Sequence, residues 1–256
     1  MHTIDINCDM GEGIGPHNGF ELDSALMSYV SSVNIACAFH AGSPSIMQNT
    51  VRAAVRQGVA IGAHPGFPDK EHFGRRALPL TAKEVYQLTL YQIGALDAFV
   101  RAEKASLHHV KPHGALYNMA AADFQLALAI AQAIADFNPQ LILYGLSGSQ
   151  LIAAGLQVGL PVAREVFADR TYQPDGSLTP RNKPNGVITE ADVAINQAIS
   201  MVLGQLVSST DGTPVHITAE TLCIHGDGEQ ALLFAKSIHN RFQKRGIKVQ
   251  AIAANR

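Results

Sequence analysis

The hydrophobic positions of the chain fall into short β-prone runs that alternate with longer amphipathic segments. Runs rich in Val, Ile, Leu and Ala predict strands at residues 3–8, 33–38, 59–63, 107–111, 141–144, 161–167, 221–225 and 247–252. Strands that alternate with helices are typical of a parallel sheet. We therefore expect an α/β protein assembled from repeated β/α units.

Apolar residues at helical spacing and capping signals predict the intervening helices. Two helical faces are expected, one at Leu126, Ile130, Ile134 and Phe137, the other at Ile195, Ile199, Val202 and Leu206. The segment Thr81-Ala82-Lys83-Glu84 has the pattern of a capping box, and Thr189 with Asp192 resembles one. Helices are thus predicted to start after Thr81 and Thr189.

Glycine and proline positions mark the connections. Gly58, Gly159 and Gly246 each stand between a helix-like segment and a β-prone run, where glycine tolerates the left-handed conformation that ends a helix. Residues 169–186 form the longest irregular stretch and are rich in turn residues, which predicts a functional or mobile loop. Because no linker or composition shift divides the chain, we expect a single barrel domain over residues 1–256.

Composition excludes several classes of protein. The chain of 256 residues is 47% hydrophobic and 16% charged, with a net charge of -2, which disfavours both disorder and a nucleic-acid partner. Its three cysteines have no paired spacing, and no apolar run approaches the roughly 18 residues of a membrane helix. We expect a cytoplasmic protein without a membrane partner, and the low charge favours a homo-oligomer or a larger complex.

Proton-active side chains follow five of the predicted strands, each next to a glycine-containing turn. They are Asp9 and Glu12, His40, His64, Lys111 and His113, and His225 with Asp227. The carboxyl ends of parallel strands meet on one face of a β/α fold, where catalytic groups gather. A single strand-end histidine is often only a hydrogen-bonding residue. The recurrence at five strand ends favours a catalytic face.

The chemistry of this face stays open between several types of site. Asp9, His40, His64, His113 and His225 offer ligands for a divalent cation, but no His-x-x-x-His or His-Glu-x-x-His spacing is present. The sequence also lacks a phosphate-loop motif, a Gly-x-Ser-x-Gly motif and a dinucleotide fingerprint. Whether a metal is bound is therefore not determined by the sequence.

Charged residues around the long loop form a second candidate site. Glu165, Asp169 and Arg170 follow a predicted strand, and Arg181 ends the Pro/Gly-rich stretch. Guanidinium groups suit a carboxylate or phosphate, so these residues are candidates for a substrate or phosphate clamp; the alternative is a surface ion-pair cluster. Lys111, held extended by the following proline, is either a base with a lowered pKa, an anion clamp or a solvated side chain.

Long motifs in the chain resemble those of the LamB/YcsF family. They are DINCDMGE (5–12), NIACAFHAG (34–42), GAHPGFPD (62–69), GRR (74–76), HVKPHGALYN (109–118), REVFADRTYQPDGSLTPR (164–181) and CIHGD (223–227). The resemblance implies a seven-stranded, distorted TIM barrel related to polysaccharide deacetylases. It also implies hydrolysis of 5-oxo-L-proline to L-glutamate, coupled to hydrolysis of ATP with its Mg²⁺, by a complex with partner subunits B and C.

Two positions depart from the family pattern. Ala38 stands where the family usually has glycine, which we expect only to narrow a backbone approach. Ser43 stands where an aspartate is common, so any role of that carboxylate does not transfer to this chain.

Three functional hypotheses follow. In the first, the chain is the lactam-hydrolase component of the complex: Asp9 or His113 transfers protons, His40, His64 and Lys111 orient groups and stabilise charge, and Arg170 or Arg181 holds an anion. ATP then binds an unconventional pocket or one of the partners. The second is a stand-alone, metal-dependent deacetylase or amidohydrolase. The third is a non-catalytic component that binds a lactam or a sugar.

Overall fold

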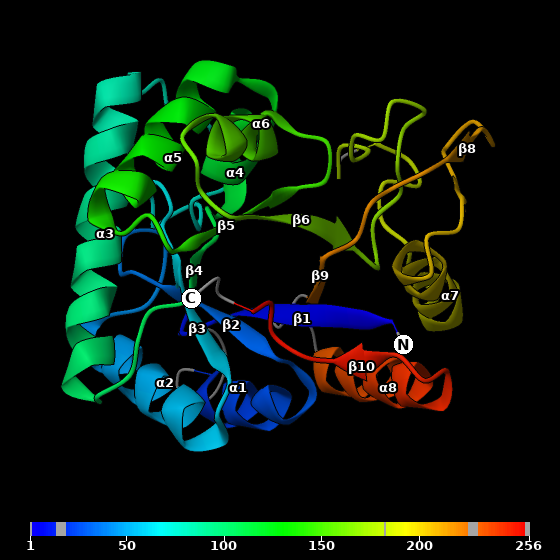
Figure 1. The fold of residues 1–256 in the computed structure, drawn as a ribbon, viewed down its shortest axis with the longest axis horizontal. Helices are drawn as coiled ribbons and strands as arrows, with labels where there is room; N and C mark the ends of the chain where they lie inside the picture. Colours follow the sequence, from blue (N-terminus) through cyan, green and yellow to red (C-terminus); the bar gives the residue numbers. More distant parts are fainter. Residues whose placement is uncertain (1, 14–18, 182, 225–229, 254–256) are drawn as a thin grey trace.

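Seven parallel strands in the described part of the chain close into a barrel (Figure 1). The computed structural model describes residues 2–13, 19–181, 183–224 and 230–253. Around the ring, the strands are β1 (Thr3–Met10), β2 (Ser32–Ala36), β3 (Ala60–His64), β4 (His109–Val110), β5 (Ile142–Leu146), β6 (Val162–Phe167) and β9 (Thr221–Ile224). Strand β9 pairs back to β1, with Asp5 opposite Thr221, and this closure confirms the predicted seven-stranded (β/α) barrel.

Helices enclose the strands on the outside of the barrel, as Figure 1 shows. They are α1 (Phe20–Leu26), η2 (Met27–Tyr29), α2 (Pro44–Gln57), α3 (Ala82–Ala102), α4 (Gly114–Ala122), α5 (Phe124–Phe137), α6 (Gln150–Gln157), α7 (Ala191–Val202) and α8 (Ala231–Lys244). No single helix within the described residues is long and apolar enough to cross a membrane; α4 and α5 pass that test only as a pair bent by 116°.

Most of the predicted element boundaries agree with the structure. All eight predicted strands are present, the eighth as β10 (Lys248–Val249), which pairs with the first residues of β1 outside the ring. Helix α3 begins with the full Thr81–Glu84 capping box. Gly58, Gly159 and Gly246 have φ values of 67°, 78° and 68°, so the predicted left-handed conformation at all three turns is confirmed.

Two predictions at the ends of α7 are wrong. The helix begins at Ala191, and its N-cap is Glu190, which makes no side-chain capping hydrogen bond; the predicted Thr189 cap is therefore absent. At the other end the helix stops at Val202, and Leu206 lies beyond it with 59% of its surface exposed. The positive φ of 69° at Gly204 turns the chain out of the helix, so Leu206 cannot continue the buried face.

A short hairpin and three short helical segments have no counterpart among the predicted elements. The hairpin consists of β7 (Val207–Ser208) and β8 (Pro214–Val215), and the helical segments are α1, η2 and α4. Each is too short to show a clear period of apolar residues.

The interior of the barrel is polar at one end, where a buried carboxylate is held by hydrogen bonds. Asp5 accepts from Ser32, Tyr144 and Thr221, at 2.7, 2.9 and 2.6 Å. Burial raises the pKa of Asp5, and these hydrogen bonds with Ser32 and Thr221 oppose that rise. A buried polar group is tolerated when its hydrogen-bonding capacity is met, so this network is a structural layer beneath the candidate site.

Candidate active site

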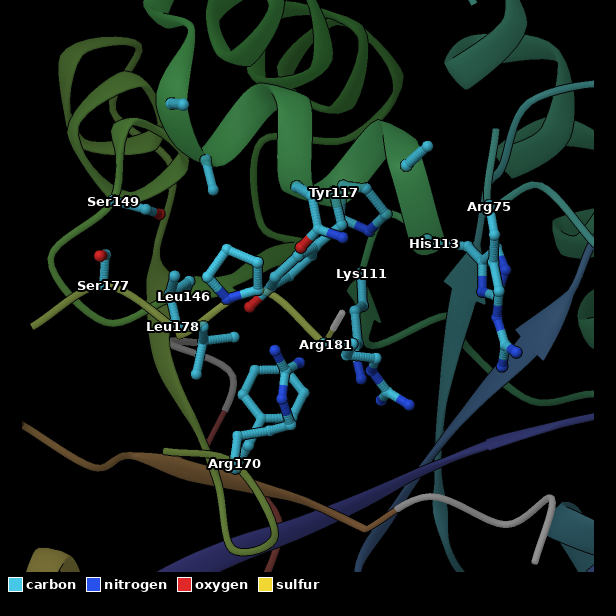
Figure 2. Close-up of a pocket in the computed structure, with 18 of the residues that line it drawn as sticks. Arg75, Lys111, His113, Tyr117, Leu146, Ser149, Arg170, Ser177, Leu178 and Arg181 are labelled. Atoms are coloured by element: carbon cyan, nitrogen blue, oxygen red, sulfur yellow. The ribbon is translucent and has the colours of Figure 1, made fainter. Parts of the chain in front are cut away.

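A cavity of about 670 Å³ opens at the carboxyl ends of the strands (Figure 2). Asp9 and Glu12 reach it from the end of β1, His64 from the end of β3, and Lys111 and His113 from the segment that follows β4. The convergence of these strand ends on one mouth agrees with the catalytic face predicted from the sequence.

Lys111 lies at the floor of this cavity as a buried cation. Its Nζ lies 3.1 Å from Asp9 Oδ1, 2.8 Å from Glu165 Oε1 and 3.1 Å from Cys223 Sγ. Burial by itself lowers the pKa of the ammonium, but Asp9, Cys223 and Glu165 raise it well above its usual value. Lys111 is therefore charged at neutral pH, so the alternative of a lysine base with a lowered pKa does not apply.

Asp9 is held as a carboxylate at the edge of the cavity. Its Oδ1 accepts hydrogen bonds from Asn34 Nδ2 at 2.8 Å and from Lys111 Nζ at 3.1 Å, and its Oδ2 lies 3.4 Å from His64 Nε2. Burial by itself raises the pKa of Asp9, but His64 and Lys111 outweigh it and lower the pKa well below its usual value. Asp9 is ionised at neutral pH.

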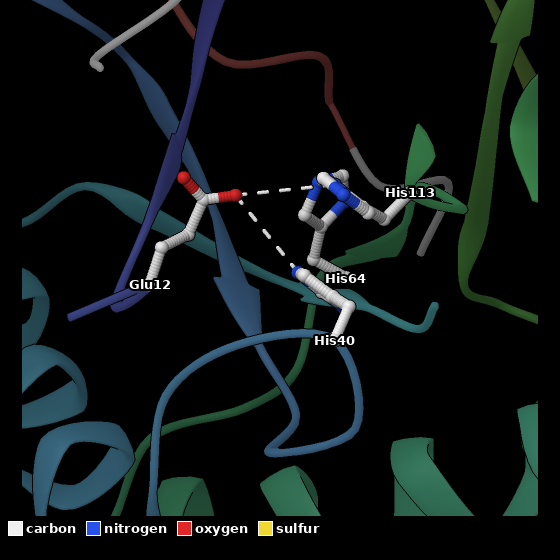
Figure 3. Close-up of side chains that lie close together, drawn as sticks. All are labelled: Glu12, His40, His64 and His113. Carbon is white, nitrogen blue, oxygen red and sulfur yellow. Dashed lines mark hydrogen bonds and ion pairs between the residues drawn. The ribbon is translucent and has the colours of Figure 1, made fainter. Parts of the chain in front are cut away.

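Three histidine rings pack together beside Glu12, as Figure 3 shows. The rings of His40 and His113 are stacked, with centroids 3.8 Å apart, and His64 meets His113 edge to face. Glu12 Oε1 lies 3.9 Å from both His40 Nε2 and His113 Nδ1. One ligand atom from each of these four residues lies within 4.8 Å of the others, which is a spacing suited to a metal ion.

The rings of His40 and His113 are neutral at neutral pH. Burial lowers the pKa of His113 to about 3 and that of His40 well below its usual value, and repulsion from neighbouring histidines adds to both effects. These side chains therefore offer lone pairs rather than positive charge.

Three guanidinium groups line the cavity. Arg75 lies beside His113, whereas Arg170 and Arg181 belong to the long loop, Arg181 in an exposed position (Figure 2). Arg170 donates to the carbonyl oxygens of Gly186 and Thr179 at 3.1 and 2.6 Å, so much of its hydrogen-bonding capacity holds the loop. The main role of Arg170 is therefore to hold the loop.

Besides His40, which stacks on His113 without lining the cavity, four of the predicted site residues lie away from it or cannot be placed. Glu165 is fully buried beneath it, where it accepts from Lys111. Asp169 lies at the start of the long loop without lining the cavity. The last two, His225 and Asp227, lie outside the described residues.

Sequence reasoning missed several polar residues that complete the site. Asn7 and Asn34 are fully buried in β1 and β2, and their side chains bond to each other at 2.8 Å and to Glu165 and Asp9, respectively. The sequence signal for these two residues was an asparagine within an otherwise apolar predicted strand. Arg75 could have been found through the GRR motif at 74–76.

The three cysteines do not serve as nucleophiles in this arrangement. All are free and buried. Burial raises the pKa of each thiol, to about 12 for Cys37 and well above the usual value for Cys8 and Cys223, so little reactive thiolate exists at neutral pH.

Comparison with known proteins assigns the family. The model of the LamB/YcsF family matches residues 4–256 of the chain. The chain belongs to the LamB/YcsF family. Among its LamB/YcsF relatives, the 5-oxoprolinase A subunit of Geobacillus kaustophilus is 56% identical over 98% of this chain and 97% of the relative. The protein of the same name from Bacillus subtilis is 51% identical over 100% and 99%.

A solved structure supports the LamB/YcsF fold. The crystal structure of the lactam utilization protein from Thermus thermophilus has a TM-score of 0.90 to this chain and is 43% identical to it, covering 98% of this chain and 100% of the other. More distant matches include a family 4 carbohydrate esterase from Streptomyces lividans, at a TM-score of 0.47 and 13% identity, with 99% of this chain and 94% of the esterase covered. The family resemblance stated from the motifs is confirmed.

Proposed function

We propose that this chain is the A subunit of an ATP-dependent 5-oxoprolinase, the component that opens the lactam of 5-oxo-L-proline to give L-glutamate. Relatives that are 51–56% identical over nearly their whole length carry this name. The observation that carries the proposal is the cavity itself, which is lined both by strand-end groups such as Asp9 and by arginines.

The lining of the cavity suits the two ends of 5-oxoproline. The substrate has a carboxylate, which Arg181 can bind through its guanidinium group. Its lactam then lies toward Asp9 and His113. A cavity of about 670 Å³ lies within the range that accepts drug-sized ligands, which leaves room for a phosphoryl group on the lactam.

The lactam is a resonance-stabilised amide without a good leaving group, and this explains the need for ATP. Transfer of the γ-phosphoryl group of ATP to the lactam carbonyl oxygen weakens the amide bond. Water then attacks the carbonyl carbon. The ring C–N bond breaks, the nitrogen takes up a proton, and hydrolysis of the acyl phosphate releases phosphate and glutamate. At neutral pH Asp9 is in the proton-accepting form because its pKa lies well below its usual value.

Binding of ATP is assigned to the partner subunits. The sequence contains no Gly-x-x-x-x-Gly-Lys-Ser/Thr motif, which is the common cradle for nucleotide phosphates. We place ATP and its Mg²⁺ on subunits B and C, and the lactam on this chain. Because the reaction consumes ATP, we place the complex in the cytoplasm.

A coupled assay of the complete complex tests this function. The purified chain alone should form no glutamate from 5-oxoproline and ATP, whereas addition of subunits B and C should produce glutamate and ADP. Asp9→Asn should abolish glutamate formation in the complex, with Asp136→Asn on the surface helix α5 as the matched control of full activity. A complete complex that forms no glutamate would refute the proposal.

The metal-dependent amidohydrolase remains a second candidate, since Glu12 and the three histidines lie close enough to hold an ion. This candidate requires that the chain alone cleave an amide with a metal and without ATP. The same assay, run without ATP and partners, separates the two functions.

A further inference from the structure

Two histidine ring nitrogens face each other in the wall of the cavity. His64 Nδ1 lies 2.7 Å from the carbonyl oxygen of Lys111, and His113 Nε2 lies 2.9 Å from that of Phe73. A carbonyl oxygen only accepts, so both of these nitrogens carry hydrogen. When both rings are neutral, the remaining nitrogens, His64 Nε2 and His113 Nδ1, are both unprotonated, yet they lie 2.9 Å apart.

Two converging lone pairs at this distance repel each other unless a cation lies beside them. A proton on one ring is one solution and a metal ion is the other. The surroundings of the pair distinguish these solutions, because a proton needs only two partners, whereas a metal ion needs three or four.

His40 supplies the third nitrogen. It is 1% exposed, and neither of its ring nitrogens has a hydrogen-bond partner among the described residues. A Cβ at Gly66 would collide with the His40 ring, and one at Gly74 would come within 2.7 Å of His40 Cβ, so backbone packing fixes the ring without hydrogen bonds. An unsatisfied buried polar group is costly, and ligation of a cation would satisfy it.

Glu12 supplies an anionic oxygen to the same point. Its Oε1 lies 3.9 Å from His40 Nε2 and from His113 Nδ1 (Figure 3). In a tetrahedral site with bonds of about 2.0–2.1 Å, ligand atoms are about 3.3 Å apart. The separations in the cluster extend from 2.9 Å to at most 4.8 Å, on either side of this value, so side-chain movements that draw the four groups together would complete the geometry.

We infer that Glu12, His40, His64 and His113 form a binding site for one divalent metal ion of the zinc class. Three imidazoles and one carboxylate suit zinc or cobalt better than magnesium, which prefers oxygen ligands and keeps its waters. Asp9 adds a negative charge 3.4 Å from His64 Nε2, which favours a cation and helps to orient that ring.

The proposed site faces the substrate. Glu12, His64 and His113 line the cavity, so an ion among them is open to a ligand there. Such an ion would polarise a carbonyl or phosphoryl oxygen and so promote the proposed lactam hydrolysis. The biological role of the metal site therefore rests on that proposed function.

Metal uptake by the full chain tests the site directly. After treatment with a chelator and its removal, the chain should bind one equivalent of Zn²⁺ at about pH 7.5 in calorimetry, and Co²⁺ should give the visible absorption of a tetrahedral site. Loss of an outer partner of a metal ligand typically weakens binding about 10–100-fold, so His40→Ala, which removes a ligand, should weaken it more than about 100-fold. His239→Ala, in α8, is the matched control and should bind as the wild type does.

Glu12→Gln provides a second variant should His40→Ala fail to fold. This variant should still bind one equivalent of Zn²⁺, with lower affinity, and should have a shifted Co²⁺ spectrum. Absence of stoichiometric uptake, or equal affinity in wild type and both variants, would overturn the metal site and leave a shared proton between His64 and His113. These measurements use neither the partners nor 5-oxoproline, so their failure is distinct from a failure of the glutamate assay.

Discussion

Ala38 occupies a backbone conformation that glycine adopts more easily. Its φ is 66°, in the left-handed region, two residues before His40. The family pattern has glycine at this position, so the departure has a steric cost rather than only a narrower backbone approach. A side chain with a Cβ costs about 1–2 kcal/mol in this region.

Ala38→Gly should stabilise the protein. Relief of the left-handed strain outweighs the extra flexibility of glycine in the unfolded chain, which is worth about 0.5–1 kcal/mol, so we expect a net gain of about 0.5–1 kcal/mol. Urea unfolding measures this difference. Ala102→Gly, at an exposed helical position of α3, is the control and should lose up to about 1 kcal/mol; the same loss at Ala38 would contradict the argument.

Ser43 fills a structural role at the other departure from the family. It is the N-cap of α2, and its side chain accepts a hydrogen bond from the backbone N–H of Ile46 at 3.3 Å. Aspartate and serine are both good N-cap residues, so either one satisfies this helix end. Serine therefore caps α2 at the position where aspartate is common in the family.

At the scale of elements, the long loop after β6 is held in place by hydrogen bonds and forms one wall of the cavity. Arg170 forms an isolated bridge to Val187, and Tyr172 forms one to Leu178. Gln197 of α7 donates to the carbonyl oxygens of Ala168 and Arg170, at 3.1 and 2.8 Å. Backbone carbonyls thus tie the loop to its base while its tip lines the site.

Two arginines of this loop should therefore respond differently to substitution. Arg170→Gln leaves buried carbonyl partners unsatisfied and should lower the free energy of unfolding by about 1–3 kcal/mol. Arg181→Gln, at an exposed position, should change stability by less than about 0.5 kcal/mol. If Arg181 binds the substrate carboxylate, it should raise the KM for 5-oxoproline about 10-fold or more, since a hydrogen bond to a charged group is worth about 1.5–3 kcal/mol.

Thermal melts of the chain and steady-state kinetics of the complex measure these effects. An unchanged KM in Arg181→Gln would remove this residue from the proposed clamp and leave Arg75 as its candidate. Loss of stability in Arg181→Gln equal to that in Arg170→Gln would show that both arginines serve the loop.

At the scale of the whole molecule, buried charge is balanced in the centre of the barrel. Lys111 faces Asp9 and Glu165, which come from strands on opposite sides of β9 in the ring. Removal of one member of a buried ion pair leaves an uncompensated charge. Barrel closure and the electrostatics of the site therefore depend on each other.

Buried neutral histidines should make the fold sensitive to acid. Burial keeps the pKa values of His40, His109 and His113 below the usual value, so the unfolded chain binds more protons than the folded one as the pH falls through about 6.5. Burial also raises the pKa of Asp5, and that of Asp23 to about 6, which has the opposite sign because the folded state then binds the extra proton. The three histidines outnumber these two carboxyl groups, so stability should fall as the pH falls from about 7 to about 5.

Near pH 6, the free energy of unfolding should change with a slope that corresponds to roughly one to two protons, or about 1.4–3 kcal/mol per pH unit. Urea unfolding at a series of pH values, with a chelator present, measures it. His109→Asn should reduce the slope by up to about one proton, whatever its effect on absolute stability. Stability that stays constant or rises as the solution is acidified across this range would contradict the burial of these rings as neutral groups.

The sequence by itself determined the order of the elements and the chemistry at the strand ends. Apolar periodicity, the capping box at Thr81 and the glycines after three helices are local signals, so they specify strands, helices and turns without the rest of the fold. The rule that parallel strands end on one face then placed Asp9, His64 and His113 in one site. The ends of α7 were wrong because a cap pattern does not show whether its side chain reaches the backbone.

Only the tertiary structure decided which charges meet and what they become. Lys111 and Glu165 are 54 residues apart, and no local pattern indicates that a buried ion pair keeps the lysine charged. Backbone carbonyls of Lys111 and Phe73, which come from separate segments, orient the facing rings of His64 and His113. Hydrogen-bond direction and burial are properties of the packed molecule, so protonation states and the proposed metal site follow from the fold.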